Sequence, residues 1–280
     1  MARPRSSPRS GHGRGAPLDV TIELGAATDV GRVRPHNEDA YLAREHVAAV
    51  ADGMGGHAAG DVASARAIEA LESVVEGEGL RAEDIQTALD RANEAILAEV
   101  ALAPEKSGMG TTLAGVALIQ YGGSPHWIVF NIGDSRVYRI ADGQALQLTV
   151  DHSEVAELMA LGRITAAEAA VHPLRNVITR SLGTTPAPRA DLWIFPASPS
   201  GDTFVACSDG LTNELDDTTI ATIVTGARGP GDAAAELVAS AVDAGGRDNI
   251  TAVVVHGVPK DDDEPSAATA PRPAIEEGRR

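Results

Sequence analysis

Apolar residues along the chain follow two patterns, one typical of strands and one typical of helices. Alternating or β-branched runs predict strands near residues 19–27, 46–51, 111–120, 126–132, 135–140, 144–149, 203–207 and 250–257. Runs rich in Ala, Leu and Glu predict helices near 60–76, 83–102, 153–161 and 231–244. Asp142-Gly143 separates two of the strand runs, which predicts a two-residue hairpin turn.

The order of these elements indicates an α+β fold. Many strands lie at hairpin spacing and are interrupted by paired helices, so we expect mostly antiparallel sheets and no regular alternation of strand and helix. Residues 18–258 contain no linker-like break and no internal repeat, which predicts one continuous domain. Residues 1–17 are rich in Pro, Gly, Ser and Arg and predict a disordered basic arm, and 259–280 predict a disordered tail.

Composition restricts the kind of protein this can be. With 43% hydrophobic and 22% charged residues, the chain is typical of a soluble globular protein. No run approaches the roughly 18 consecutive apolar residues of a membrane span, and no apolar stretch of a secretory signal follows the N-terminal arginines. Cys207 is the only cysteine, so an internal disulfide is excluded and a reducing cytoplasm is expected.

The formal net charge is −17, and the predicted domain is more acidic still because the N-terminal arm is basic. An acidic surface repels nucleic acid and anionic membranes, so we expect neither as a partner. Any phosphate that binds to such a domain needs local positive charge, from an arginine or from a metal ion.

Aspartates repeatedly stand at the ends of hydrophobic strands, beside Gly or Asn. The segments are Val47–Val50 before Asp52-Gly53, Ile128–Phe130 before Gly133-Asp134, Phe204–Cys207 before Asp209-Gly210, and Asp248-Asn249 before Ile250–Val255. Strand ends hold carboxylates rigidly, and adjacent glycines let ions come close. If these ends converge, the repulsion between carboxylates requires hard divalent cations. Oxygen ligands alone favour Mg²⁺ or Mn²⁺ over zinc.

A single Asp-Gly pair is more often a turn than a ligand, as we expect for Asp142-Gly143. The whole set in its order is more informative. It consists of Arg34-Pro-His-Asn-Glu38-Asp39, Asp52-Gly-Met-Gly-Gly, Gly110-Thr-Thr-Leu, Gly133-Asp-Ser-Arg, Leu148-Thr-Val-Asp-His-Ser, Thr179-Arg-Ser-Leu-Gly, Ser208-Asp-Gly-Leu and Arg247-Asp-Asn-Ile. The series resembles the metal-dependent type 2C serine/threonine protein phosphatase family, in particular its bacterial branch, over roughly residues 20–257.

The resemblance implies a central sandwich of two antiparallel β-sheets flanked by helical layers (α-β-β-α), with two Mn²⁺ or Mg²⁺ ions at one edge. It also implies roles for particular residues. Asp52 would bridge the two ions, the Gly53 carbonyl would bind one of them, and Asp209 and Asp248 would hold the other. Asp134 with Asp209 would form a weaker third metal site, and Glu38 and Asp39 would act through water or from behind the ligands. Arg34 would clamp the substrate phosphate.

By this resemblance, residues 18–258 form a phosphatase catalytic domain that hydrolyses phosphoserine and phosphothreonine in proteins. A metal-bridging hydroxide would attack phosphorus in line, with no phosphoenzyme. Expected partners are phosphorylated proteins, either a Ser/Thr kinase or its substrates, and we expect a monomer. The resemblance does not distinguish these from a dedicated phosphoprotein regulator.

One departure leaves the proton donor unassigned. Eukaryotic members carry His after the Asp-Gly of the second motif, whereas this chain has Met54, as bacterial members commonly do. His57 is a weak substitute, and His152 is expected to order the loop before the next helix. Residues from about 153 to 180 have the position of the family's flap, which would shape substrate access.

Parts of the sequence are compatible with three other functions. Gly53 to Ala58 fits the dinucleotide-binding pattern G-x-G-x-x-A, but a second helix follows the first where that fold needs a strand. A cysteine-based phosphatase needs an arginine six residues after its nucleophile, and Asn213 stands there after Cys207. The remaining alternative is a catalytically silent member of the same fold that acts as a binding module.

Overall fold

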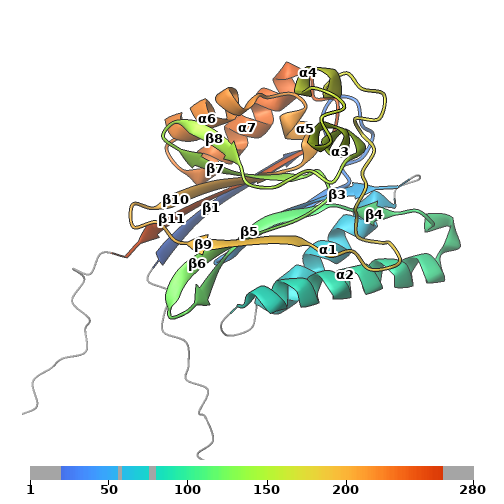
Figure 1. Cartoon of the computed structure of the whole chain (residues 1–280), viewed down its shortest axis with the longest axis horizontal. Coiled ribbons are helices and arrows are strands. Elements are labelled where there is room, and N and C mark those ends of the chain that lie inside the picture. The colour runs from blue at the N-terminus through green and yellow to red at the C-terminus, as the bar shows by residue number, and fades with distance from the viewer. Residues whose placement is uncertain (1–19, 56–58, 76–79, 261–280) are drawn as a thin grey trace, which may run out of the picture.

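Two antiparallel sheets pack face to face, and helices cover the outer face of each (Figure 1). The computed structural model describes residues 20–55, 59–75 and 80–260. The predicted arm at 1–17 lies outside the described residues, as do His57 and the predicted tail beyond residue 260. The layers of the described part confirm the predicted α-β-β-α sandwich.

The first sheet has the strand order β1-β11-β10-β7-β8. These strands are β1 (Val20–Asp29), β7 (Arg136–Ala141), β8 (Gln144–Gln147), β10 (Asp202–Cys207) and β11 (Ile250–Pro259). Between β7 and β8, Asp142 and Gly143 both have positive φ, 51° and 71°. Two consecutive positive φ angles are the mark of a tight two-residue hairpin, so the predicted turn is confirmed.

The second sheet has the order β2-β3-β5-β6-β9, with β4 paired to β3. The strands are β2 (Asp39–Arg44), β3 (Val47–Met54), β4 (Gly110–Thr111), β5 (Leu113–Tyr121), β6 (Ser124–Ile132) and β9 (Asp191–Pro196). The strand predicted at 111–120 is divided at Thr112 into β4 and β5, and the Thr112 backbone N–H donates to the carbonyl of Asp52.

Helices α1 (Gly60–Val75) and α2 (Ala82–Leu102) cover the second sheet, and α6 (Asp217–Gly226) and α7 (Pro230–Ala244) cover the first. Shorter helices lie in the connections. They are η1 (Pro104–Lys106), α3 (Glu154–Ala160), α4 (Ala166–Ala169) and α5 (Asp209–Thr212). Among the described residues, none of the helices combines the length and the apolar character that a bilayer crossing requires.

The buried apolar side chains form three layers. One layer lies between the sheets and includes Val50, Val129, Phe204 and Val253. The second lies between the second sheet and helices α1 and α2, and the third between the first sheet and helices α6 and α7. Since both sheets are buried on both faces, their central strands are rigid supports for whatever stands at their ends.

Strand direction brings four predicted strand ends to one end of the sandwich. β3 and β6 both run antiparallel to β5, so their last residues lie at the same end of the second sheet. β10 runs antiparallel to β11, so the end of β10 lies beside the start of β11. Hydrogen bonds from Ser208 and Thr251 to Asp39 join the two sheets at this end. The convergence that the sequence analysis required is present.

Candidate metal and phosphate site

Asp52 stands near the end of β3 with its backbone held by two threonines. The Asp52 carbonyl accepts hydrogen bonds from the Thr111 hydroxyl, at 2.9 Å, and from the Thr112 N–H, at 3.0 Å. The Asp52 N–H donates to the Thr112 hydroxyl oxygen at 3.0 Å. Because both backbone groups are engaged, the Asp52 carboxylate projects from a fixed point.

Asp39 lies directly opposite Asp52 in the β2–β3 register. One of its carboxylate oxygens, Oδ2, accepts hydrogen bonds from Ser208 Oγ at 2.8 Å and Thr251 Oγ1 at 2.7 Å. The other oxygen, Oδ1, is buried and has no hydrogen-bond partner within the described ranges. A buried acceptor without a donor is unfavourable and points to a further group at this position.

Asp209 and Asp248 come from the two adjoining strand ends of the first sheet. Asn213 Nδ2 donates to Asp209 Oδ2 at 3.1 Å. Arg34 Nη2 donates to Asp248 Oδ2 at 2.6 Å, and half of the Arg34 side chain is exposed. The predicted phosphate clamp therefore lies inside the site, paired with one of the predicted metal ligands.

Gly53 packs against the start of α1 without room for a side chain. A Cβ at Gly53 would lie 2.1 Å from the Gly60 carbonyl oxygen and 2.6 Å from that of Glu38. The Gly53 N–H donates to the Glu38 carbonyl at 3.2 Å. Asn249 holds Glu38 from the other sheet, since its Oδ1 accepts the Glu38 N–H at 2.9 Å.

Asp134 follows β6 in a loop that His152 holds. His152 Nδ1 accepts the backbone N–H of Gly133 at 3.0 Å, so the ring proton is on Nε2, which donates to Asp191 Oδ2 at 3.1 Å. Arg180 pairs with the same Asp191 carboxylate at 2.7 Å. His152 therefore holds the loop at Gly133 in place through this hydrogen bond.

The carboxylates affect one another's ionisation. Burial, followed by the charges of Asp39, Asp209, Asp134 and Asp248, raises the pKa of Asp52 well above its usual range. Burial raises the pKa of Asp39 and that of Asp134 to about 7, with Asp209 contributing to both. Burial and the charge of Asp248 raise the pKa of Asp209. Side-chain hydrogen bonds with Asn213 and Asp52 lower it and so oppose part of this effect. Together these groups disfavour full ionisation unless cations are close.

These residues suit a hard divalent cation. The donors are carboxylate and carbonyl oxygens, and the Asp39 oxygen without a partner is one more acceptor. In the described part of the chain, no group of three or more His, Cys, Asp or Glu side chains is placed so that it could hold a metal ion as it stands. Asp209 and Asp248 instead face Asn213 and Arg34, which supply the hydrogen-bond donors there.

A family model described as protein phosphatase 2C matches residues 32–237, most of the chain. The chain belongs to this family.

Bacterial protein phosphatase 2C relatives resemble the chain over most of its length. The serine/threonine phosphatase stp of Listeria monocytogenes serotype 4b (strain F2365) is 38% identical over 239 residues, which are 81% of this chain and 93% of that protein. The crystal structure of the Mycobacterium tuberculosis serine/threonine phosphatase PstP/Ppp matches with a TM-score of 0.77 at 38% identity, over 84% of this chain and 98% of that one. The catalytic domain of PstP in complex with two manganese ions also has a TM-score of 0.77, at 36% identity, over 85% of this chain and 99% of that one.

A cleft of about 780 Å³ opens beside the carboxylates of this phosphatase 2C chain. Its lining includes Arg34, Asp134, Asp209 and Asp248 together with residues of α3 and α4. The cleft thus opens onto these four predicted site residues, and residues of the predicted flap segment line part of it.

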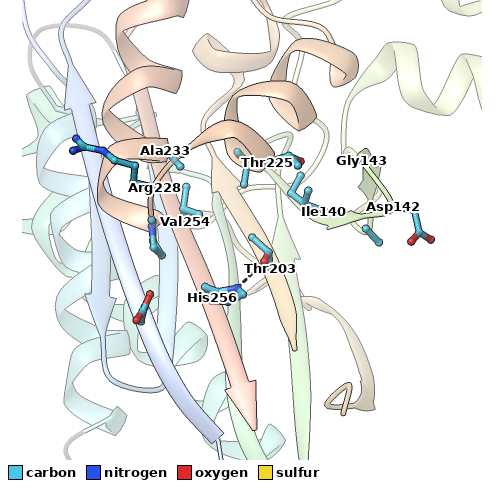
Figure 2. A pocket seen from close by; sticks show the side chains of 15 residues that line it. Ile140, Asp142, Gly143, Thr203, Thr225, Arg228, Ala233, Val254 and His256 are labelled. Carbon is cyan, nitrogen blue, oxygen red and sulfur yellow. Dashed lines mark hydrogen bonds between the residues drawn. The ribbon is translucent and has the colours of Figure 1, made fainter. Parts of the chain in front are cut away.

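A second hollow, of about 460 Å³, lies away from these carboxylates (Figure 2). It is lined by Ile140, Thr203, Val254 and His256 from the first sheet and by the α6–α7 connection. Thr203 Oγ1 and His256 Nδ1 lie 2.9 Å apart, so this pair is already hydrogen-bonded. None of the predicted phosphatase 2C site residues lines this hollow, and we place no function in it.

Sequence reasoning did not identify the residues that support this phosphatase 2C site. Thr111, Thr112, Ser208, Thr251 and Asn249 hold Asp52, Asp39 and Glu38 in place. All except Thr251 belong to the quoted motifs, so the signal was present. Their hydroxyl and amide groups, next to predicted ligands, were the clue to a supporting role.

Proposed function

We propose that this chain hydrolyses phosphoserine and phosphothreonine in proteins with the help of divalent cations, and so opposes Ser/Thr kinases. One observation carries the proposal: Asp52, Asp39, Asp134, Asp209 and Asp248 converge at one end of the sandwich, where burial and neighbouring carboxylates raise the pKa of the first four. Such a cluster is costly for the fold unless cations bind to it. Its family relatives are named as serine/threonine phosphatases, and one was solved with two manganese ions.

We propose the following roles for the residues of the site. Asp52 and the Gly53 carbonyl would hold one ion, and Asp52, Asp209 and Asp248 the other. Asp134 with Asp209 would hold a weaker third, while Glu38 and Asp39 would act through water or from behind these ligands. Mn²⁺ or Mg²⁺ suits this oxygen set, and when bound such ions neutralise the carboxylates and activate water for attack on phosphorus.

Arg34 is the residue of this chain that would bind the phosphate. Its guanidinium is half exposed and already lies in the site through its ion pair with Asp248. A phosphate offers the planar, bidentate acceptor that guanidinium prefers. Arg34 would therefore exchange Asp248 for two phosphate oxygens and stabilise the charge that develops on them. Met54 has no proton to give, so the donor to the leaving oxygen is another group.

The proposed partners are phosphorylated proteins, a Ser/Thr kinase or its substrates among them. We further propose that the chain works as a monomer in the cytoplasm. A buried free thiol at Cys207 is in keeping with a reducing compartment.

Metal dependence on real substrates tests the proposed function. Purified chain should release phosphate from p-nitrophenyl phosphate and from phosphoserine and phosphothreonine peptides when Mn²⁺ or Mg²⁺ is present. Chelation should stop turnover, and added metal should restore it. The alternative, a silent binding module, predicts phosphopeptide binding by calorimetry without any release of phosphate under the same conditions.

A further inference from the structure

The cleft beside the carboxylates contains an apolar surface that the proposed chemistry does not use. We call it the apolar wall, and its residues are Val33, Val155, Met159, Ala166, Ala169 and Ala170. Val155 and Met159 are four residues apart in α3, while Ala169 and Ala170 follow Ala166 by three and four. At these spacings each short helix turns one face to the cleft.

The apolar wall stands on a segment with a fixed base. The Glu154 N–H donates to the Val177 carbonyl at 2.9 Å, and the Thr179 N–H donates to the His152 carbonyl at 2.8 Å. Ser153 and Ile178 form an isolated β-bridge. The two ends of the flap are therefore joined, and its helices present a defined surface to the cleft.

The apolar wall is accessible and has room for a side chain. Met159 is 38% exposed and Val33 is 67% exposed. Ala166 and Ala170 are also exposed, whereas Val155 and Ala169 are buried at the base of the wall. Exposed apolar side chains grouped at a binding cleft mark a place where another apolar group is buried.

Most charges that line the cleft are already paired with each other. Arg136 forms a bidentate ion pair with Asp151 at 2.6 Å, and Arg247 pairs with Glu214 at 2.9 Å. Within the described ranges, Arg175 is the guanidinium in the lining that makes no ion pair. Paired charges attract a flanking charge weakly, so burial on the apolar wall is the stronger basis for selection.

We propose that the apolar wall binds a large apolar side chain close to the phosphorylated residue, so that preferred substrates carry Leu, Ile, Met or Phe near the phosphoserine or phosphothreonine. The proposal rests on the proposed function, because the phosphate must sit at Arg34 and the carboxylates. The wall lines the same cleft as those groups, so one short peptide segment reaches both.

The first measurement compares phosphoserine peptides with wild-type protein and Mn²⁺. Each peptide has a Gly/Ser background and carries Leu, Ser, Asp or Glu at one position on either side of the phosphoserine. At one or two positions, kcat/KM should be about ten-fold higher for Leu than for Ser, the size expected when an apolar side chain fills a pocket.

Substitutions in the apolar wall then test whether the preference for Leu arises there. Met159→Gln and Ala166→Asn make the wall polar without adding charge, and each should reduce the Leu-to-Ser ratio to below about three-fold. The matched control is Ala167→Asn, because Ala167 is exposed, lies in the same turn of α4 and does not line the cleft. It should keep the wild-type ratio. Thermal unfolding of each variant checks that it is folded, and the ratio is independent of the amount of active protein.

Three results would overturn the inference. One is that Leu gives no advantage at any position, and another is that the advantage persists in both wall variants. Selectivity that follows Asp or Glu in the peptide and disappears in Arg175→Gln would assign recognition to charge instead. Absence of metal-dependent turnover on every peptide and on p-nitrophenyl phosphate would overturn the proposed function as well, so the two failures are distinct.

Discussion

At the scale of single residues, Gly53 shows how tightly the site is built into the fold. The backbone of β3 passes the first turn of α1 so closely that a Cβ would fall 2.1 Å from the Gly60 carbonyl oxygen. The same residue offers the carbonyl that we assign to an ion. The close contact of Gly53 with α1 and its proposed role as a metal ligand thus both require a residue without a side chain.

Gly53→Ala should therefore lower both stability and metal affinity. Overpacking against backbone costs about 1–3 kcal/mol, which urea denaturation measures, and displacement of the Gly53 carbonyl should weaken Mn²⁺ binding in a calorimetric titration. Gly226→Ala is the control, since a Cβ there meets nothing within 4 Å. Equal stability and equal Mn²⁺ affinity for both variants would contradict the assignment of Gly53.

Residue patterns revealed the strand-end aspartates but not what holds them. Asp52, Asp134, Asp209 and Asp248 stand beside Gly or Asn at strand ends, a pattern visible in the sequence. Asp39 is held by Thr251, which lies 212 residues away in the chain. No local pattern reports a contact at that separation, and the pairing of Arg34 with Asp248 was missed for the same reason.

At the scale of elements, three of the longer ones were not predicted, each for a physical reason. β2 is an edge strand without a continuous apolar run, and β9 is an edge strand whose short apolar run, Leu192–Phe195, is partly exposed on both faces. α6 is rich in Thr, Ile and Val, which favour strands. The Asp216 side chain caps its first turn by accepting the Thr219 N–H, and buried Ile220 packs against the first sheet, which outweighs the propensity.

The two sheets are also joined by a buried polar link among the early residues of β6 and β10. Asp202, with 1% of its side chain exposed, accepts hydrogen bonds from Trp127 Nε1 at 2.8 Å and Arg139 Nη2 at 2.7 Å. Trp127 belongs to the second sheet, while Asp202 and Arg139 belong to the first. This link lies at the start of β6 and β10, whereas the carboxylates follow their ends.

Asp202→Ala should destabilise the fold by roughly 3 kcal/mol, because it leaves Arg139 and the Trp127 N–H without their partner. Chemical denaturation measures the loss. Mn²⁺ affinity of the folded variant should equal that of wild type, since the altered residue is at the far end of the strands. Weakened Mn²⁺ binding at a temperature where the variant is folded would show that the two ends are coupled.

At the scale of the whole molecule, the buried carboxylates of the site should make the free energy of unfolding depend on pH. Burial raises the pKa of Asp39 and that of Asp134 from 3.8 to about 7. The folded chain then holds protons that the unfolded chain releases, so this contribution to stability is complete below about pH 4 and is lost as pH rises through about 7.

Without divalent ions, the contribution of Asp134 should make wild type lose more stability than Asp134→Asn between about pH 5 and pH 8. Scanning calorimetry measures the stability of both proteins at each pH. Subtracting one pH profile from the other removes the effect of the titrating groups that the two proteins share. Mn²⁺ should abolish the difference in slope, because bound cations favour the ionised carboxylates. Parallel pH profiles for the two metal-free proteins would contradict the raised pKa of Asp134.

The most direct test of the central claim is Mn²⁺-dependent hydrolysis of a phosphothreonine peptide by three proteins measured side by side. Wild type should turn over only with Mn²⁺. Asp209→Asn should lose at least about 100-fold in kcat/KM, as expected for a direct metal ligand. Asp142→Asn changes the same Asp-Gly dipeptide in a hairpin turn and should behave as wild type. Turnover that survives chelation, or that is equal in wild type and Asp209→Asn, would contradict the account.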